Sequence, residues 1–134
     1  MYGQRINAPV IAVLTEKAAT GASSAISVND YQKLGIQFGT TDSTNATIKF
    51  AVSLSEIAPD FGSAQSATNH WDYVDVIDLQ DGASIDGDTG ITLSGTDDVR
   101  NFQANCENVK WFAAIVTAHS AGKITVKVKP STNA

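Results

Sequence analysis

The chain has 134 residues, of which 43% are hydrophobic and 17% are charged, and its formal net charge at pH 7 is −5. This length suffices for one domain with a substantial core, and the composition excludes global disorder. The acidic balance argues against nucleic acid as a partner, because duplex binders neutralise phosphates with clustered Lys and Arg. The single cysteine, Cys106, excludes an intrachain disulfide and a cysteine-based zinc site.

The N-terminal segment, MYGQRINAPVIAVLTEKAATG, contains one Arg and only a short apolar run. It lacks the pattern of a secretory signal and the roughly 18 apolar residues that a membrane span needs. The sequence therefore predicts a soluble protein that is made in the cytoplasm and has no membrane partner. We expect residues 1–20 to form an extended arm and residues 21–134 to form a single domain.

Segments with β character recur about every ten residues, a spacing typical of β-sandwiches and jelly rolls. Clusters of Gly, Asp, Ser and Thr between them supply turns. The sequence thus predicts an all-β fold, an antiparallel β-sandwich or jelly roll of about eight strands, with at most one helical turn at Ser55–Phe61. The predicted strands are Val10–Leu14, Tyr31–Phe38, Ala46–Ser53, Trp71–Leu79, Gly90–Ser94, Val99–Ala104, Val109–His119 and Gly122–Lys129.

The apolar pattern also predicts which strand faces are buried. Most strands alternate apolar and polar residues, so one face is expected to be wet. Val109–His119 is apolar on both faces, which predicts a central strand whose second face is covered by a loop such as Pro59–His70 or by another subunit. A turn around residues 120–122 is expected to separate it from Gly122–Lys129, where three apolar residues alternate with Lys and Thr.

Charge is distributed unevenly along the chain. No Lys or Arg lies between Phe50 and Val99, whereas ten acidic residues do, and from Arg100 onward basic residues predominate. One interpretation is solvated acidic loops together with a strand whose lysines block unwanted strand addition. The other is a module whose acidic end meets a basic neighbour in an ordered array.

No motif has the spacing of an enzyme active site. The segment DGASIDGDTG lacks both the Asp spacing and the final Glu of an EF-hand loop, and Asp-Gly pairs are typical of turns. Cys106 lies in a polar strand end with nothing to activate it, so an ordinary thiol is expected. We therefore predict a non-enzymatic protein with no catalytic residue, cofactor or metal. His70, Trp71 and Tyr73 remain the best candidates for ligand contacts.

Four phrases of the sequence carry a family resemblance: TGASSAISVNDYQKLGIQFGTTDSTNATIKFAVSLSEIAPDF, WDYVDVIDLQDG, GITLSGTDDVRNFQ and VKWFAAIVTAHSAGKITVKVK. Over about residues 20–129 the chain resembles a group of small β-sandwich structural proteins of tailed bacteriophages. It is also similar to the broader galactose-binding, discoidin-like class of jelly rolls, whose members bind glycans or protein surfaces through loops.

The resemblance implies a non-enzymatic virion protein made in the cytoplasm of a bacterial host. The small size, the single cysteine and the lack of a coiled-coil stalk favour a capsid decoration, or cement, protein that binds the major capsid protein and stabilises the head. We expect the arm, through Tyr2, Arg5 and Val10, and the strand Val109–His119 to mediate docking and homo-oligomer formation, with a trimer as one arrangement.

Other functions remain open at this stage. The chain could be a tail, baseplate or head-fibre component, which differs from a decoration protein in copy number. It could instead be a carbohydrate-binding adhesion module that contacts a glycan through His70, Trp71, Tyr73 and the acidic loops.

Overall fold

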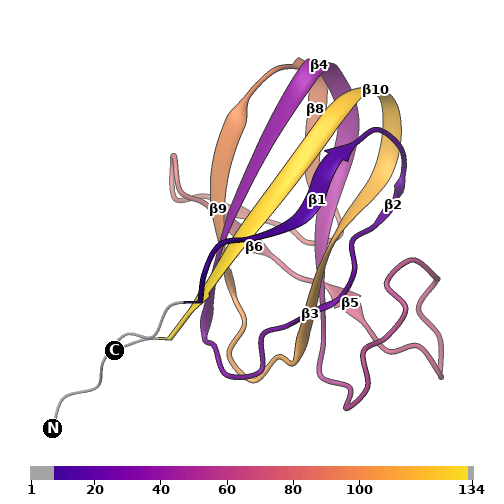
Figure 1. Ribbon diagram of the computed structural model, residues 1–134, viewed down its shortest axis with the longest axis vertical. Coiled ribbons are helices and arrows are strands. Elements are labelled where there is room, and N and C mark those ends of the chain that lie inside the picture. Colours follow the sequence, from indigo (N-terminus) through magenta and orange to yellow (C-terminus); the bar gives the residue numbers. More distant parts are fainter. Residues whose placement is uncertain (1–7, 133–134) are drawn as a thin grey trace, which may run out of the picture.

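The computed structural model describes residues 8–132, which form an all-β fold (Figure 1). No described residue is helical, so the helical turn considered for Ser55–Phe61 does not form. Within this range no helix could span a lipid bilayer. The strands are β1 (Ile11–Lys17), β2 (Gly21–Ala22), β3 (Ile26–Ser27), β4 (Lys33–Ser53), β5 (Asp72–Tyr73), β6 (Val76–Asp78), β7 (Ser84–Ile85), β8 (Ile91–Thr96), β9 (Val99–Asn105) and β10 (Trp111–Ser131).

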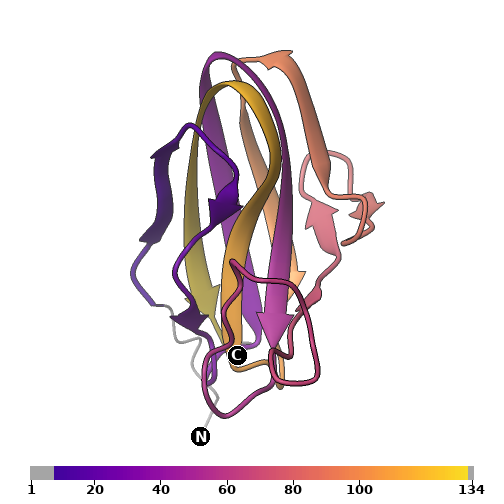
Figure 2. The same ribbon diagram turned by 90° about the vertical axis from the view of Figure 1, so that its right-hand side faces the viewer.

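Two long, bent strands organise the fold. β4 and β10 each have 21 residues and pair antiparallel along their length, from Trp111 opposite Ser53 to Ser131 opposite Lys33. Each was predicted as two strands separated by a turn. The turn residues in fact bend the strand, so that each half continues into a different layer of the fold (Figures 1 and 2).

The bends fold one continuous antiparallel sheet into a sandwich of two layers. Layer one has the order β1–β10–β4–β9–β6–β7 and uses the second half of β10 and the first half of β4. Layer two contains the other halves of these strands, with β2 and β3 beside β10 and with β5 and β8 beside β4. The prediction of an antiparallel β-sandwich is therefore confirmed.

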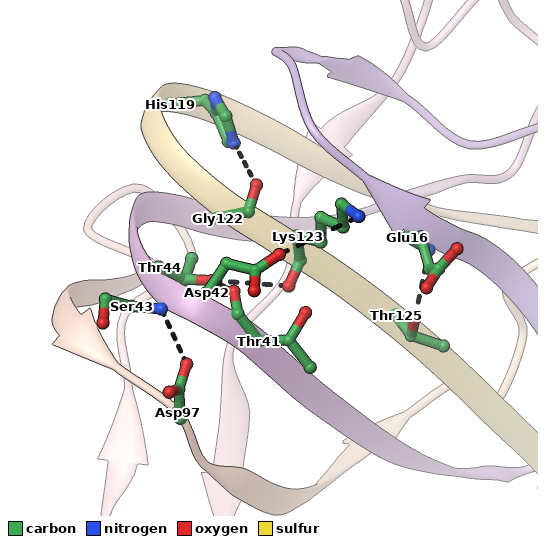
Figure 3. Close-up of polar contacts among 10 residues, drawn as sticks. All are labelled: Glu16, Thr41, Asp42, Ser43, Thr44, Asp97, His119, Gly122, Lys123 and Thr125. Atoms are coloured by element: carbon green, nitrogen blue, oxygen red, sulfur yellow. Dashed lines mark hydrogen bonds and ion pairs between the residues drawn. The ribbon is translucent and has the colours of Figure 1, made fainter.

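Backbone conformation and buried polar contacts produce the two bends (Figure 3). Asp42 and Ser43 have φ of 62° and 53° in β4, and Gly122 has φ of 86° in β10. Between them lies Thr44, whose buried hydroxyl donates to the carbonyls of Thr41 (2.8 Å) and Lys123 (3.3 Å). The positive φ values turn the chain, and the Thr44 hydroxyl satisfies carbonyl groups that regular pairing leaves open.

The main core lies between the layers, where the predicted alternation places its apolar residues. Every second residue from Leu34 to Phe38 and from Ile124 to Val128 is buried, as the sequence predicts. Phenylalanine rings stack in two pairs, Phe38 with Phe102 at 5.5 Å between ring centroids and Phe50 with Phe112 at 5.9 Å. Each stacked pair adds about 1 kcal/mol beyond the burial of its area.

A second, smaller cluster covers the other face of the first half of β10. Ala113 and Ile115 lie there beside Ala51 and are capped by Phe61 from the loop after β4. The expectation that a loop covers this face is thus confirmed, and the face is buried within a single copy. The docking role expected for Val109–His119 stays a prediction; Ala113 and Ile115 are covered, whereas Thr117 and Ala118 near the end of the segment are exposed.

The N-terminal strand β1 belongs to layer one. Ile11 pairs with Val128, and Leu14 is buried against the core. Part of the segment predicted as an arm, residues 11–17, thus contributes a strand to the sheet, and Ala8 donates a backbone hydrogen bond to Pro130. Residues 1–7, and with them Tyr2 and Arg5, lie outside the described part of the chain.

Candidate binding surfaces

The loop of residues 54–70, between β4 and β5, is held in shape by side-chain hydrogen bonds, four of which Asn69 makes. The amide nitrogen of Asn69 donates to the carbonyls of Asp60 (2.8 Å), Ser63 (3.3 Å) and Ala64 (3.1 Å). Its amide oxygen accepts from the Asp60 backbone nitrogen at 2.8 Å. Asn69 thereby satisfies the backbone groups of a loop that has only a single isolated bridge, between Ser66 and Asn69.

Three aromatic rings join this loop to layer two. Trp71 packs at 5.9 Å from Phe61 and edge-on at 5.1 Å from Tyr73, measured between ring centroids. Its indole nitrogen donates to the Ser63 carbonyl at 3.1 Å. Trp71 and Tyr73 are half-buried against the second cluster, so part of each ring packs within the protein and stabilises the loop.

Two shallow grooves flank the loop and meet at His70. One, of about 750 Å³, runs from Ser55 and Ile57 to Asn69. The other, of about 600 Å³, lies between Leu54 and Trp71. Leu54 and Ile57 are 70% and 83% exposed at their rims. The loop therefore presents apolar side chains and an exposed imidazole on an ordered backbone, an arrangement suited to binding.

The outward side of layer one is a basic surface, which we call the lysine face: Lys33, Lys123, Lys127, Lys129, Gln37, Asn101 and Gln103. These residues alternate with buried ones along β4, β9 and β10, so they point away from the core. A groove of about 330 Å³ crosses this face between Val10 and Leu79, with Gly35 also lining it. Both apolar residues are more than half exposed, at 60% and 55%.

A second charged surface lies on the β5–β8 side of the sandwich, opposite β1 and β2 (Figure 2). We call it the aspartate patch; its members are exposed and surround the turn that Gly87 occupies: Asp72, Asp75, Asp86 and Asp88. Asp75 accepts the Gly87 backbone N–H at 2.7 Å. Burial raises the pKa of Tyr73, as do the nearby charges of Asp88 and Asp72, so this ring lies within a negative field.

The remaining polar groups have structural roles. Asp78 is buried, and its carboxylate pairs with the guanidinium of Arg100, which also lies 5.7 Å from the centre of the Phe102 ring. Burial raises the pKa of the Cys106 thiol to about 11, so it is protonated at neutral pH and is a poor nucleophile. Among residues 8–132, no three His, Cys, Asp or Glu side chains gather as a metal site would require.

The candidate site residues thus separate onto different surfaces. His70, Trp71 and Tyr73 lie together beside the loop, whereas Val10 lies at the groove of the lysine face. Sequence reasoning missed Asn69, for which a lone Asn in a polar loop gives no specific signal. It also missed the lysine face as a surface, although the alternation of lysines along β10 indicated one exposed row.

Similarity to known proteins is confined to the fold. No protein-family model matches the sequence, and no curated protein is similar to it. The solved structure of SPBc2 prophage-derived protein YomS aligns over 98% of both chains with a TM-score of 0.72 at 8% identity. PBSX exported protein XepA aligns over 98% of this chain with a TM-score of 0.70 at 10% identity; the chain spans 40% of its length. At such identities the likeness shows a shared fold alone.

Proposed function

We propose that this chain is a non-enzymatic structural protein of a tailed-phage particle, which decorates the head by binding the major capsid protein. The observation that supports this proposal is the shared fold with YomS, a prophage-derived protein that the chain matches from end to end. The ordered loop, the lysine face and the aspartate patch add surfaces suited to protein contacts. The mechanism is passive: many weak contacts across subunit boundaries add up to stable attachment.

The N-terminal residues are the proposed attachment arm. Val10 is exposed beside the groove of the lysine face, at the point where the chain enters β1. An arm carrying Tyr2 and Arg5 ahead of this point brings an aromatic ring and a guanidinium, two groups that are enriched in protein interfaces.

The copy number of the protein in purified particles tests the proposal. Quantitative mass spectrometry against the major shell protein is expected to give hundreds of copies, since decoration follows the capsid lattice. A dozen copies or fewer would place the protein in a tail, baseplate or fibre instead. Its absence from particles would overturn the virion role altogether.

Deletion of residues 1–7 tests the arm. This deletion leaves β1 intact, so the sandwich is expected to keep its stability, whereas a longer deletion would remove the buried Leu14. We expect the shortened protein to lose most of its binding to undecorated particles in co-sedimentation. Undiminished binding would show that the arm is dispensable.

A carbohydrate-binding function is the second candidate, favoured by one observation. The groove between Leu54 and Trp71 combines an apolar rim with the polar side chains of His70 and Asp72. A glycan array tests it: sugar-specific binding that Leu54→Ala and His70→Ala both abolish would support this function, and no binding to any glycan would remove it.

A further inference from the structure

We infer that the lysine face of one copy binds the aspartate patch of a second copy, in a head-to-tail contact. This inference rests on the proposed structural role and deepens it by naming a second copy of the chain as the partner of these two surfaces. Its test needs only the purified protein, so the self-contact and the binding to particles can fail independently.

The lysine face carries positive charge with little compensation from its own copy. Lys127 and Lys129 are exposed, and neither makes an ion pair with any residue between 8 and 132. At the bend, the Nζ atom of Lys123 lies 3.8 Å from a carboxylate oxygen of Asp42, so this lysine has an ion pair within its own copy. The amide groups of the lysine face are neutral, and Gln37 donates to Asn101 at 3.1 Å. The exposed acidic residue Glu16 lies at the edge of the face, where the Glu16 backbone nitrogen donates to the Thr125 hydroxyl at 3.0 Å.

The aspartate patch is the complementary surface. The carboxylates of Asp72, Asp75 and Asp86 accept hydrogen bonds from neighbouring groups, and none of the four carboxylates ion-pairs within the described chain. Lys49 is the cation nearby; its Nζ lies 4.9 Å from the centre of the Tyr73 ring. Four carboxylates against one ammonium group leave a net negative field, consistent with the raised pKa of Tyr73.

No ion pair joins these two charge sets within residues 8–132. The lysines lie on the outward face of β4 and β10, whereas the aspartates lie in β5 and in the connections before β6 and after β7. A symmetric contact of like surfaces would bring like charges together and is opposed. A contact between different surfaces of two copies pairs opposite charges, and such complementarity sets orientation and register.

The groove on the lysine face gives the contact an apolar component. Val10 and Leu79 stand exposed at its sides, and Gly35 lets a partner approach the β4 backbone closely. Covering these side chains removes apolar surface from water, which adds to affinity where the charge pairs mainly provide specificity.

Charge reversal tests this contact in sedimentation velocity experiments. We expect the unaltered protein to self-associate at low ionic strength, about 50 mM, and to dissociate at about 500 mM, where screening is strong. K127E/K129E alone and D86K/D88K alone are expected to remain monomeric at low ionic strength. An equimolar mixture of these two variants is expected to associate again, because each supplies a surface that the other matches.

A matched control separates this contact from an effect of net charge. Asp30→Lys with Glu107→Lys changes the net charge by the same amount as D86K/D88K, on exposed residues outside both patches. This control is expected to associate as the unaltered protein does. Circular dichroism confirms that each variant folds. An unaltered protein that stays monomeric at low ionic strength, or a mixture that fails to associate, would overturn the inference.

Discussion

At the level of single residues, Gly122 determines how closely the two bends can approach. A Cβ atom at this position would lie 2.1 Å from the Thr44 hydroxyl oxygen and 2.4 Å from the Thr44 Cα. The backbone also has a positive φ, which side chains other than glycine rarely adopt. The positive φ and the close contact with Thr44 therefore each require glycine at position 122, where β10 bends beside β4.

We predict that Gly122→Ala lowers the free energy of unfolding by about 3 kcal/mol or more, because it combines an unfavourable φ with a backbone clash. Urea denaturation followed by circular dichroism measures the loss. Gly95→Ala is the matched control: Gly95 also has a positive φ, but an added Cβ would meet no atom within 4 Å. This control is expected to cost about 1 kcal/mol. Equal losses of unfolding free energy in Gly122→Ala and Gly95→Ala would show that the clash with Thr44 contributes nothing.

Cys106 makes stability depend on alkaline pH. Burial raises its pKa from 9.0 to about 11, so the folded chain keeps the thiol proton over a range in which the unfolded chain releases it. The contribution of this thiol to the free energy of unfolding is constant below pH 9 and is lost as the pH rises from 9 toward 11. We predict that urea unfolding free energy falls more steeply over this range in the unaltered protein than in Cys106→Ala. Parallel pH profiles would show that the thiol does not contribute.

At the level of elements, the alternation of apolar residues correctly predicted which faces are buried but not how the strands connect. Leu34, Ile36 and Phe38 indicated a half-buried strand without any knowledge of the fold. The segments around Thr41 and Gly122 carry the residues of ordinary turns, and a bend within a strand uses the same residue types. A bend differs from a turn because the bent segment pairs with a segment about 80 residues away, as Thr41 does with Lys123. Local sequence does not encode such long-range pairing.

A loop such as Pro59–His70 was one of the two covers predicted for Val109–His119, the other being a second subunit, but the internal order of the loop was not predicted. Phe61, an apolar residue in this otherwise polar loop, is the side chain that packs against Ala113 and Ile115. The bonds that Asn69 makes join residues brought close only by the folded loop. The candidate ligand residues were likewise chosen for their chemistry, and the structure shows that packing occupies Trp71.

For this loop we predict that Asn69→Ala exposes residues 55–70 to proteolysis. The substitution removes the amide that joins three carbonyls and one N–H, which is expected to lower local stability by about 1–3 kcal/mol. Limited proteolysis with mass-spectrometric mapping of the cleavage sites measures how readily residues 55–70 are cut. Thr68→Ala, in the same loop, is the control and is expected to keep the resistance of the unaltered protein. Resistance in Asn69→Ala would show that the other contacts of the loop hold it without this amide.

For the molecule as a whole, the two layers share their central strands. Neither layer can lose its pairing without disturbing the other, because β4 and β10 contribute a half to each. We predict a single unfolding transition in which tryptophan fluorescence, reporting Trp71 and Trp111 beside layer two, coincides with far-ultraviolet circular dichroism. Labelling of buried Cys106, which lies next to layer one, is expected to follow the same midpoint. Separate midpoints would show that the layers unfold independently.

The continuous central strands also have a mechanical consequence. In a sandwich whose sheets touch only through side chains, a sideways load on one sheet passes to the other through packing contacts. Here the backbone of β4 and β10 runs from one layer into the other, so part of that load is carried by covalent bonds. Sliding one layer past the other would require the bends at Thr44 and Gly122 to open. We therefore expect this pair of bends to resist shear between the two layers.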